Sequence, residues 1–181
     1  MKKSLAILLT LAATQVAAQD IGYKMDAIKP GSTITFKNFD NMVDTHVFEG
    51  KTGEHYVFKT YNGPTDAQPL QATVFVTENG EVVRVEKAGG EWITFTPHNC
   101  VRTVGTCSYV QKSNKRRPMK YNRFTEVSGN TLTFSVAFNG GKIEYTGFGQ
   151  LGIHNWPDLV TVRWSHTKKE VTQKLISTDF K

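Results

Sequence analysis

Hydrophobic and polar residues alternate one by one along much of this chain. The clearest stretch has apolar Leu132, Phe134, Val136 and Phe138, with Thr131, Thr133, Ser135 and Ala137 between them. Because successive side chains of a β-strand point to opposite faces, this pattern predicts a strand with one buried face. The same period recurs at Ile34 and Phe36, Tyr56 and Phe58, Val74 and Val76, Ile93 and Phe95, and Val160, Val162 and Trp164.

A helical period of 3.6 residues is not sustained anywhere after Gln19. The one stretch open to a helical interpretation runs from Lys168 to Thr178, and its β-branched residues favour a strand. The pattern of the chain is therefore that of an all-β protein.

Residues that tolerate positive φ separate the predicted strands, at Glu78-Asn79-Gly80, Ser128-Gly129-Asn130 and Asn139-Gly140-Gly141. Strands joined by such short turns are antiparallel neighbours. We therefore predict an antiparallel meander of about ten strands that forms either a single closed barrel or a two-sheet sandwich. The succession of short turns slightly favours the barrel. A barrel with an interior cavity would line its mouth with aromatic residues that a sandwich would pack completely, namely Trp92, Phe134, Tyr145 and Trp164.

The N-terminus has the three parts of a cleavable secretory signal. Lys2 and Lys3 precede an apolar run from Leu5 to Ala13, and the small residues Val16-Ala17-Ala18 offer a cleavage site before Gln19. A run of about nine residues is shorter than the ~20 that a membrane-spanning helix needs. We predict a signal over residues 1–18, a single β domain over 19–181, and an exported, periplasmic or secreted protein without a membrane span.

Two cysteines, Cys100 and Cys107, are the only ones in the chain. In an exported protein an even cysteine count predicts a disulfide. The loop would hold about eight residues, and closing it is worth roughly 2.5 kcal/mol in the chain-entropy model. The spacing matches neither C-x-x-C nor a zinc pattern, so a redox or metal role is the weaker interpretation.

Charge adds one distinctive segment to this picture. The chain has 22 Lys and Arg and 16 Asp and Glu, and removal of the signal with its two lysines leaves a formal charge of +4. Six positive charges and no acid fall within one stretch of twelve residues, at Lys112, Lys115, Arg116, Arg117, Lys120 and Arg123. This stretch, the basic loop, is predicted to be exposed and to favour an anionic partner such as a lipid head group or a glycan. The flanking aromatic residues Tyr109, Tyr121 and Phe124 could stack on a sugar or base. A loop that only aids solubility is the alternative.

Candidate metal and cofactor sites are weak. His46 and His55 would share a face if they paired across a four-residue turn, and Asp44 would add a carboxylate, but nothing in the sequence supplies an ordered set of ligands. Residues 147–152 spell G-x-G-x-x-G without a following helix, so we interpret these glycines as bends in a strand. We predict no cofactor.

These observations favour a non-catalytic binding protein. It would engage an anionic partner through the basic loop, or hold a small apolar ligand inside a barrel. The alternatives are a small secreted hydrolase that uses carboxylates or a histidine site, and an interaction or inhibitor module. The oligomeric state is not predicted.

Overall fold

The protein is a closed barrel of twelve antiparallel strands, seen in a computed structural model that describes residues 21–181. The predicted signal and its cleavage site lie outside the described residues. The strands are β1 (Thr33–Lys37), β2 (Val43–Thr52), β3 (His55–Asn62), β4 (Leu70–Val76), β5 (Val82–Lys87), β6 (Trp92–Thr96), β7 (Gly105–Ser113), β8 (Met119–Ser128), β9 (Thr131–Phe138), β10 (Ile143–Leu151), β11 (Pro157–Trp164) and β12 (Glu170–Asp179). Two short 3-10 turns complete the structure, η1 (Met25–Ala27) and η2 (Ile153–Asn155). In this described part, no helix has the length and apolar character needed to cross a membrane.

Each strand pairs with its neighbours in sequence, and β12 pairs with β1 to close the barrel. The predicted meander is therefore confirmed, and of the two predicted architectures the barrel is the correct one. The segment from Lys168 to Thr178, interpreted as a strand, falls largely in β12. The strand count is twelve rather than about ten. Strand β2 carried little signal because it is polar on both faces: Thr45 donates to the Gly63 carbonyl, while His46 lies on the opposite face.

The glycines of the G-x-G-x-x-G sequence lie in or directly after β10, as predicted. A Cβ at Gly147 would collide with the ring of Phe134 and the carbonyl of Thr161. Glycine is therefore required here because the Phe134 ring on β9 and the backbone of β11 both approach β10 closely.

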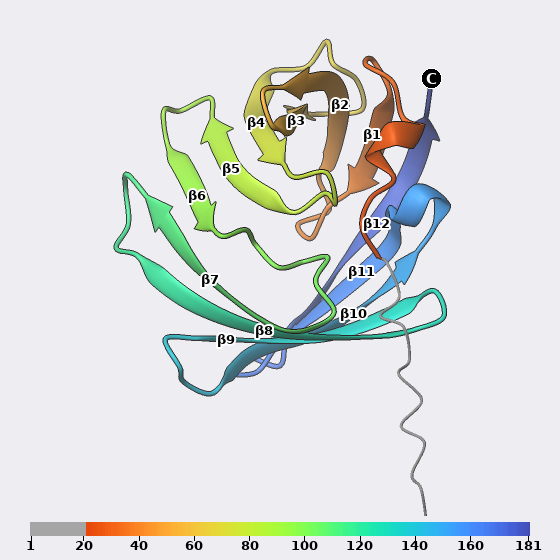
Figure 1. Cartoon of the computed structure of the whole chain (residues 1–181). Coiled ribbons are helices and arrows are strands. Elements are labelled where there is room, and N and C mark those ends of the chain that lie inside the picture. Colours follow the sequence, from red (N-terminus) through yellow and green to blue (C-terminus); the bar gives the residue numbers. More distant parts are fainter. Residues whose placement is uncertain (1–20) are drawn as a thin grey trace, which may run out of the picture.

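The turns divide the barrel into two ends. The turns that follow odd-numbered strands, at residues 38–42, 63–69, 88–91, 114–118, 139–142 and 165–169, lie at one end, which we call the mouth. The connections that follow even-numbered strands lie at the other end. In Figure 1 the β7–β8 turn lies at the left and the β8–β9 turn at the right.

The second end is sealed by segments that fold into the barrel. Residues 97–104, between β6 and β7, run inside the ring of strands in Figure 1, and we call them the strap. The N-terminal segment adds the buried side chains of Ile21, Met25 and Ile28. Tyr23 donates its backbone N–H to the Asn79 carbonyl at 3.0 Å, and its ring stacks on Trp156 with centroids 3.8 Å apart. These segments cover the second end of the barrel, which we call the sealed end.

Candidate functional site: an arginine cavity inside the barrel

A cavity of about 270 Å³ lies inside the barrel between the strap and strands β8 to β12. We call it the arginine cavity, because two guanidinium groups, those of Arg102 and Arg123, are among its lining groups. No acidic residue lines it within the described part of the chain. Its other walls are mostly apolar or aromatic and include Leu132, Phe134, Tyr145, Val160 and Val162.

Arg123 reaches the cavity from the inner face of β8. It is only 7% exposed, and its neighbours Asn122 and Phe124 point outward, as the alternation of a strand requires. Its Nε donates to the Thr125 hydroxyl at 3.1 Å, and its guanidinium lies 4.1 Å from the ring centroid of Phe134. It forms no ion pair with a carboxylate of the described residues.

Burial lowers the pKa of Arg123 below its ordinary value, and the nearby Tyr145 and Tyr109 oppose that shift. An arginine nonetheless stays protonated in proteins. The barrel interior therefore holds a desolvated cation that no carboxylate neutralises by direct contact, and such a group is costly unless something pairs with it.

Arg102 reaches the same cavity from the strap. Its guanidinium lies 3.9 Å from the ring centroid of Tyr23, and its Nε is buried without a hydrogen-bond partner. Because a buried donor without a partner costs about 1–3 kcal/mol, this N–H is suited to an acceptor on a bound molecule.

The strap is held in place by one buried carboxylate and one disulfide. Glu81 Oε1 accepts the backbone N–H of Arg102 at 2.7 Å and the Thr103 hydroxyl at 2.9 Å. The Cys100–Cys107 disulfide, predicted from the sequence, ties the strap to β7, and Cys107 is the cross-strand partner of Arg123. The disulfide thus joins the segment that carries Arg102 to the strand beside Arg123.

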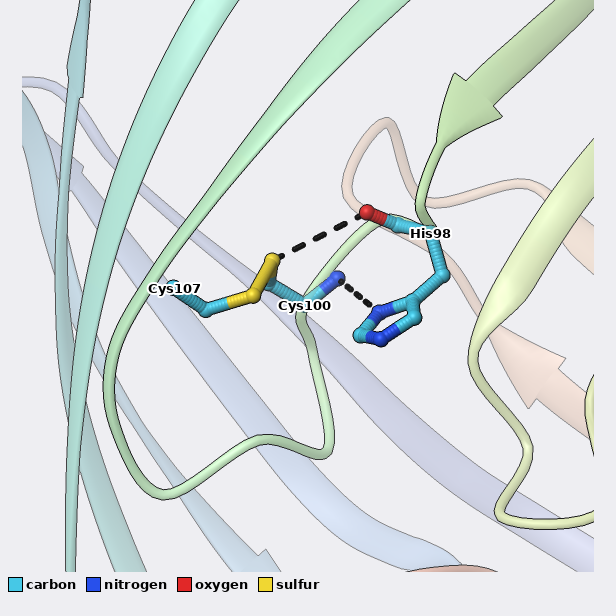
Figure 2. A group of neighbouring side chains, drawn as sticks. All are labelled: His98, Cys100 and Cys107. Atoms are coloured by element: carbon cyan, nitrogen blue, oxygen red, sulfur yellow. Dashed lines mark hydrogen bonds between the residues drawn. A yellow bond between two sulfur atoms is a disulfide. The ribbon is translucent and has the colours of Figure 1, made fainter.

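Figure 2 shows the disulfide beside His98, whose Nδ1 accepts the backbone N–H of Cys100 at 3.3 Å. The imidazole and the two sulfurs lie within 4.8 Å of one another. Because both sulfurs are bonded to each other, neither is a thiolate that could ligate a metal.

Tyr109 and Tyr145 lie near Arg123, whereas the Tyr121 hydroxyl donates to the Met119 sulfur. Burial raises the pKa of Tyr109, Tyr121 and Tyr145, so all three phenols keep their protons at neutral pH. The rings of Tyr109 and Tyr121 stack with centroids 4.9 Å apart. These residues were predicted to flank the basic loop for stacking on a ligand, and the structure stacks them on each other.

Two further compartments adjoin the arginine cavity. A larger one of about 640 Å³ lies at the mouth and shares Phe39, Tyr145 and Gln173 with it. A smaller one of about 170 Å³ shares Tyr23 and Gln173, and is walled mainly by apolar side chains that include Phe36, Phe58, Val74 and Val76. The arginine cavity thus has a neighbouring compartment on the mouth side and a mainly apolar one on its other side.

The residues predicted for the basic loop are divided by the structure. Lys115, Arg116 and Arg117 lie in the exposed β7–β8 turn, and Lys112 and Lys120 lie on the ends of the two strands that enter it. Arg123 does not join them, because it faces the barrel interior. Phe124 is 44% exposed on the outer wall, in a shallow depression that it shares with Glu126 and Thr133.

Of the four aromatics predicted at a cavity mouth, three line the interior compartments. Phe134 and Tyr145 line the arginine cavity, and Tyr145 and Trp164 line the mouth compartment. Trp92 instead is 38% exposed at the start of β6.

The weak metal candidates do not form a cluster. His46 pairs across β2 and β3 with Thr60, whereas His55 pairs with Thr52 beside the turn. Five residues of β3 separate the two positions, which is roughly 17 Å of strand. Asp44 accepts a hydrogen bond from the Asn38 side chain at 2.6 Å, and His46 Nδ1 contacts the Thr60 hydroxyl at 3.0 Å. The turn between β2 and β3 is shorter than predicted, so the two histidines fall at opposite ends of the hairpin.

No pattern in the sequence pointed to Arg102, Glu81 or Gln173. Arg102 lies in the connection between β6 and β7, and Glu81 lies directly before β5. Outside a strand, alternation does not predict which way a side chain points. Arg123 was singled out for its charge. Its place on the inner face was not predicted, because charged Arg123 points inward and apolar Phe124 outward, the reverse of the usual alternation.

Comparison of the chain with protein families, curated proteins and solved structures finds no match. The function is therefore argued from the geometry of the cavity.

Proposed function

We propose that this protein binds a small amphipathic acid inside its barrel, with the acidic group at Arg102 and Arg123 and the apolar part against the surrounding walls. The observation that carries the proposal is that two arginines, the buried Arg123 and the partly buried Arg102, line one cavity from which acidic side chains are missing among the described residues. This combines the two ligand types predicted from the sequence, an anion and an apolar molecule. The proposed anion site is in the barrel interior, whereas the sequence predicted it at the basic loop.

The charge distribution around the cavity supports an anionic ligand. Glu81 is a buried acid on the strap side; its Oε1 accepts two hydrogen bonds from the strap, its Oε2 has no hydrogen-bond partner, and neither oxygen pairs with a guanidinium of the described residues. Asp44 lines the mouth compartment and is held by Asn38. A ligand carboxylate would therefore supply the partner that neither side chain provides, and charge-assisted hydrogen bonds to arginine are among the strongest in proteins.

The walls of the cavity support an apolar body on that ligand. Leu132, Phe134, Val160 and Val162 surround the arginines, and the adjoining smaller compartment is mainly apolar. Pockets that combine apolar walls with a few polar groups are typical of small-molecule sites.

We further propose that the protein is exported. The disulfide is consistent with an oxidising compartment. The signal-like pattern of residues 1–18 supports the same location.

Isothermal titration calorimetry with decanoate and decanol tests the ligand class, because the two molecules share a tail and differ in charge. We expect decanoate to bind and decanol to bind at least tenfold more weakly, since a hydrogen bond to a charged group is worth about 1.5–3 kcal/mol. The Arg102→Met/Arg123→Met double variant should remove that preference. Arg163→Met, which removes an exposed arginine from β11, is the matched control. Equal affinity of the parent protein for the two molecules would contradict the proposal.

A further inference from the structure

The mouth end of the barrel has an excess of positive charge. Exposed cations gather on its turns and on the strand ends beside them: Lys37, Lys87, Lys112, Lys115, Arg116, Arg117, Lys120, Lys142, Lys168 and Lys169. The acids at this end are fewer: Asp40, Asp44, Asp66, Glu86, Glu91, Glu144 and Glu170. Glu91 is already paired with Lys87 at 2.9 Å. The basic loop is thus part of a larger positive rim.

Exposed apolar side chains gather on the same rim. Nine large hydrophobic residues of the described chain are exposed, and five of them lie at the mouth: Phe39, Met42, Leu70, Trp92 and Ile143. Phe39 and Met42 belong to the β1–β2 turn, and the other three begin the strands that leave mouth turns. Each is about 38–51% exposed, so much of its apolar surface faces solvent.

The sealed end differs in both respects. Its exposed cations, such as Lys29, Lys51 and Lys181, are matched by Asp26, Glu54, Glu78 and Asp179. Ile153 is the one large hydrophobic residue exposed there among those described. The combination of positive charge and exposed apolar side chains is therefore particular to the mouth.

We propose that the mouth rim docks onto the surface of an anionic lipid bilayer. Lysine and arginine are attracted to anionic head groups, and apolar side chains on the same surface insert at the boundary with the acyl chains. A nucleic acid would match the charge but leave the apolar side chains in water. The bilayer is the partner that matches both properties of the rim.

Docking in this orientation places the open cavity against the bilayer. Phe39 belongs to the rim and also lines both the mouth compartment and the arginine cavity. A molecule that leaves the bilayer would thus meet the mouth without crossing bulk water. The docking surface itself does not depend on the cavity ligand, so it goes beyond the proposed function and is tested separately.

Vesicle co-sedimentation without added ligand is the test. The full exported protein is mixed with vesicles of equal parts phosphatidylglycerol and phosphatidylcholine, or with vesicles of phosphatidylcholine alone. We expect at least tenfold tighter binding to the anionic vesicles, and this preference should fall as salt rises. The variant Lys115→Gln/Arg116→Gln/Arg117→Gln/Lys120→Gln should lose at least tenfold of that affinity.

Two matched controls separate the rim from total charge and total hydrophobicity. Lys24→Gln/Lys29→Gln/Lys51→Gln/Lys181→Gln removes as much charge from the sealed end and should bind anionic vesicles within about twofold of the parent. Met42→Ser/Ile143→Ser should weaken binding severalfold, whereas Phe148→Ser/Ile176→Ser, on the outer wall, should not. Thermal melting confirms that each variant is folded.

Equal binding of the parent to both kinds of vesicle would overturn the proposal, as would equal losses in the two quadruple variants. Binding to a short single-stranded DNA but not to vesicles would also overturn it, in favour of a nucleic-acid partner.

Discussion

Arg123 is the residue at which stability and binding make opposite demands. Its guanidinium is removed from water, contacts one hydroxyl and one aromatic face, and forms no ion pair within the described chain. A buried charge of this kind is costly in the free protein. Its presence is understandable if the cost is recovered when an acidic ligand binds.

Arg123→Met is accordingly expected to leave the free energy of unfolding unchanged or to raise it, because a side chain of similar length fills the site without a charge. The same substitution should weaken decanoate binding at least tenfold. Urea unfolding and calorimetry measure the two effects. A loss of more than about 1 kcal/mol of stability would show instead that the contacts with Thr125 and Phe134 hold the barrel together.

His46 predicts a pH dependence. Burial lowers its pKa to about 4, and the opposing attraction of Asp44 is smaller. The His46 side chain is half-buried, and it lines the smaller, mainly apolar compartment inside the barrel. Since the unfolded chain takes up a proton near pH 6.5 and the folded protein only near pH 4, stability falls as the pH drops through this window. The loss due to His46 is at most about 3 kcal/mol.

Urea unfolding between pH 7 and pH 4 measures this loss. The His46→Gln variant should show a shallower decline than the parent over that window. His166→Gln, which removes an exposed histidine, should follow the parent. Parallel curves for the His46 variant and the parent would mean that burial does not lower the pKa of His46 in the folded protein.

At the scale of elements, the strap forms one wall of the proposed binding site. It has no regular secondary structure, yet it carries Arg102 into the interior and closes the sealed end. Glu81 and the disulfide are what keep it there.

The Cys100→Ser/Cys107→Ser variant should therefore show two effects, a loss of stability and a separate loss of ligand preference in the protein that remains folded. Removal of the disulfide is expected to cost about 2–3 kcal/mol of unfolding free energy for a loop of about eight residues. Freeing the strap should also reduce the preference for decanoate over decanol, because Arg102 is no longer fixed beside Arg123. Calorimetry at a temperature where the variant is folded distinguishes the two effects. An unchanged preference would show that Glu81 alone positions the strap.

At the scale of the whole molecule, the ends of the barrel have different roles. One end is covered by the N-terminal segment, the strap and η2, and the other has the mouth compartment beneath a positive rim. This polarity arises because the long connection and the chain terminus both lie at the same end.

Native mass spectrometry of protein purified from its own compartment should reveal a retained small acid, released on denaturation. The intact mass of the denatured chain should correspond to a start at Gln19 with the disulfide formed. Parent protein without any retained ligand that also fails to take up decanoate would count against the carrier proposal, whereas vesicle binding by that same protein would leave the docking surface standing.

The sequence by itself determined most of the strands, several of their turns and the disulfide, because these depend on neighbouring residues. Alternation sets which face of a strand is apolar, and residues such as Gly80 and Asn139 supply the positive φ that a short turn requires. The alternating apolar residues of the stretches from Leu132 to Phe138 and from Val160 to Trp164 were identified in this way. Among them, Leu132, Phe134 and Val162 line the inside of the barrel as predicted.

Only the tertiary structure decided between barrel and sandwich, since both bury alternate residues and differ in whether the last strand reaches the first. That closure sets β12 beside β1 and brings Gln173 to the cavity. It also decided the site, because Arg102 enters on an irregular strap and meets Arg123 from a different element. Contacts between residues that are adjacent in space but on different elements depend on how the whole chain folds back on itself, and no local pattern records them.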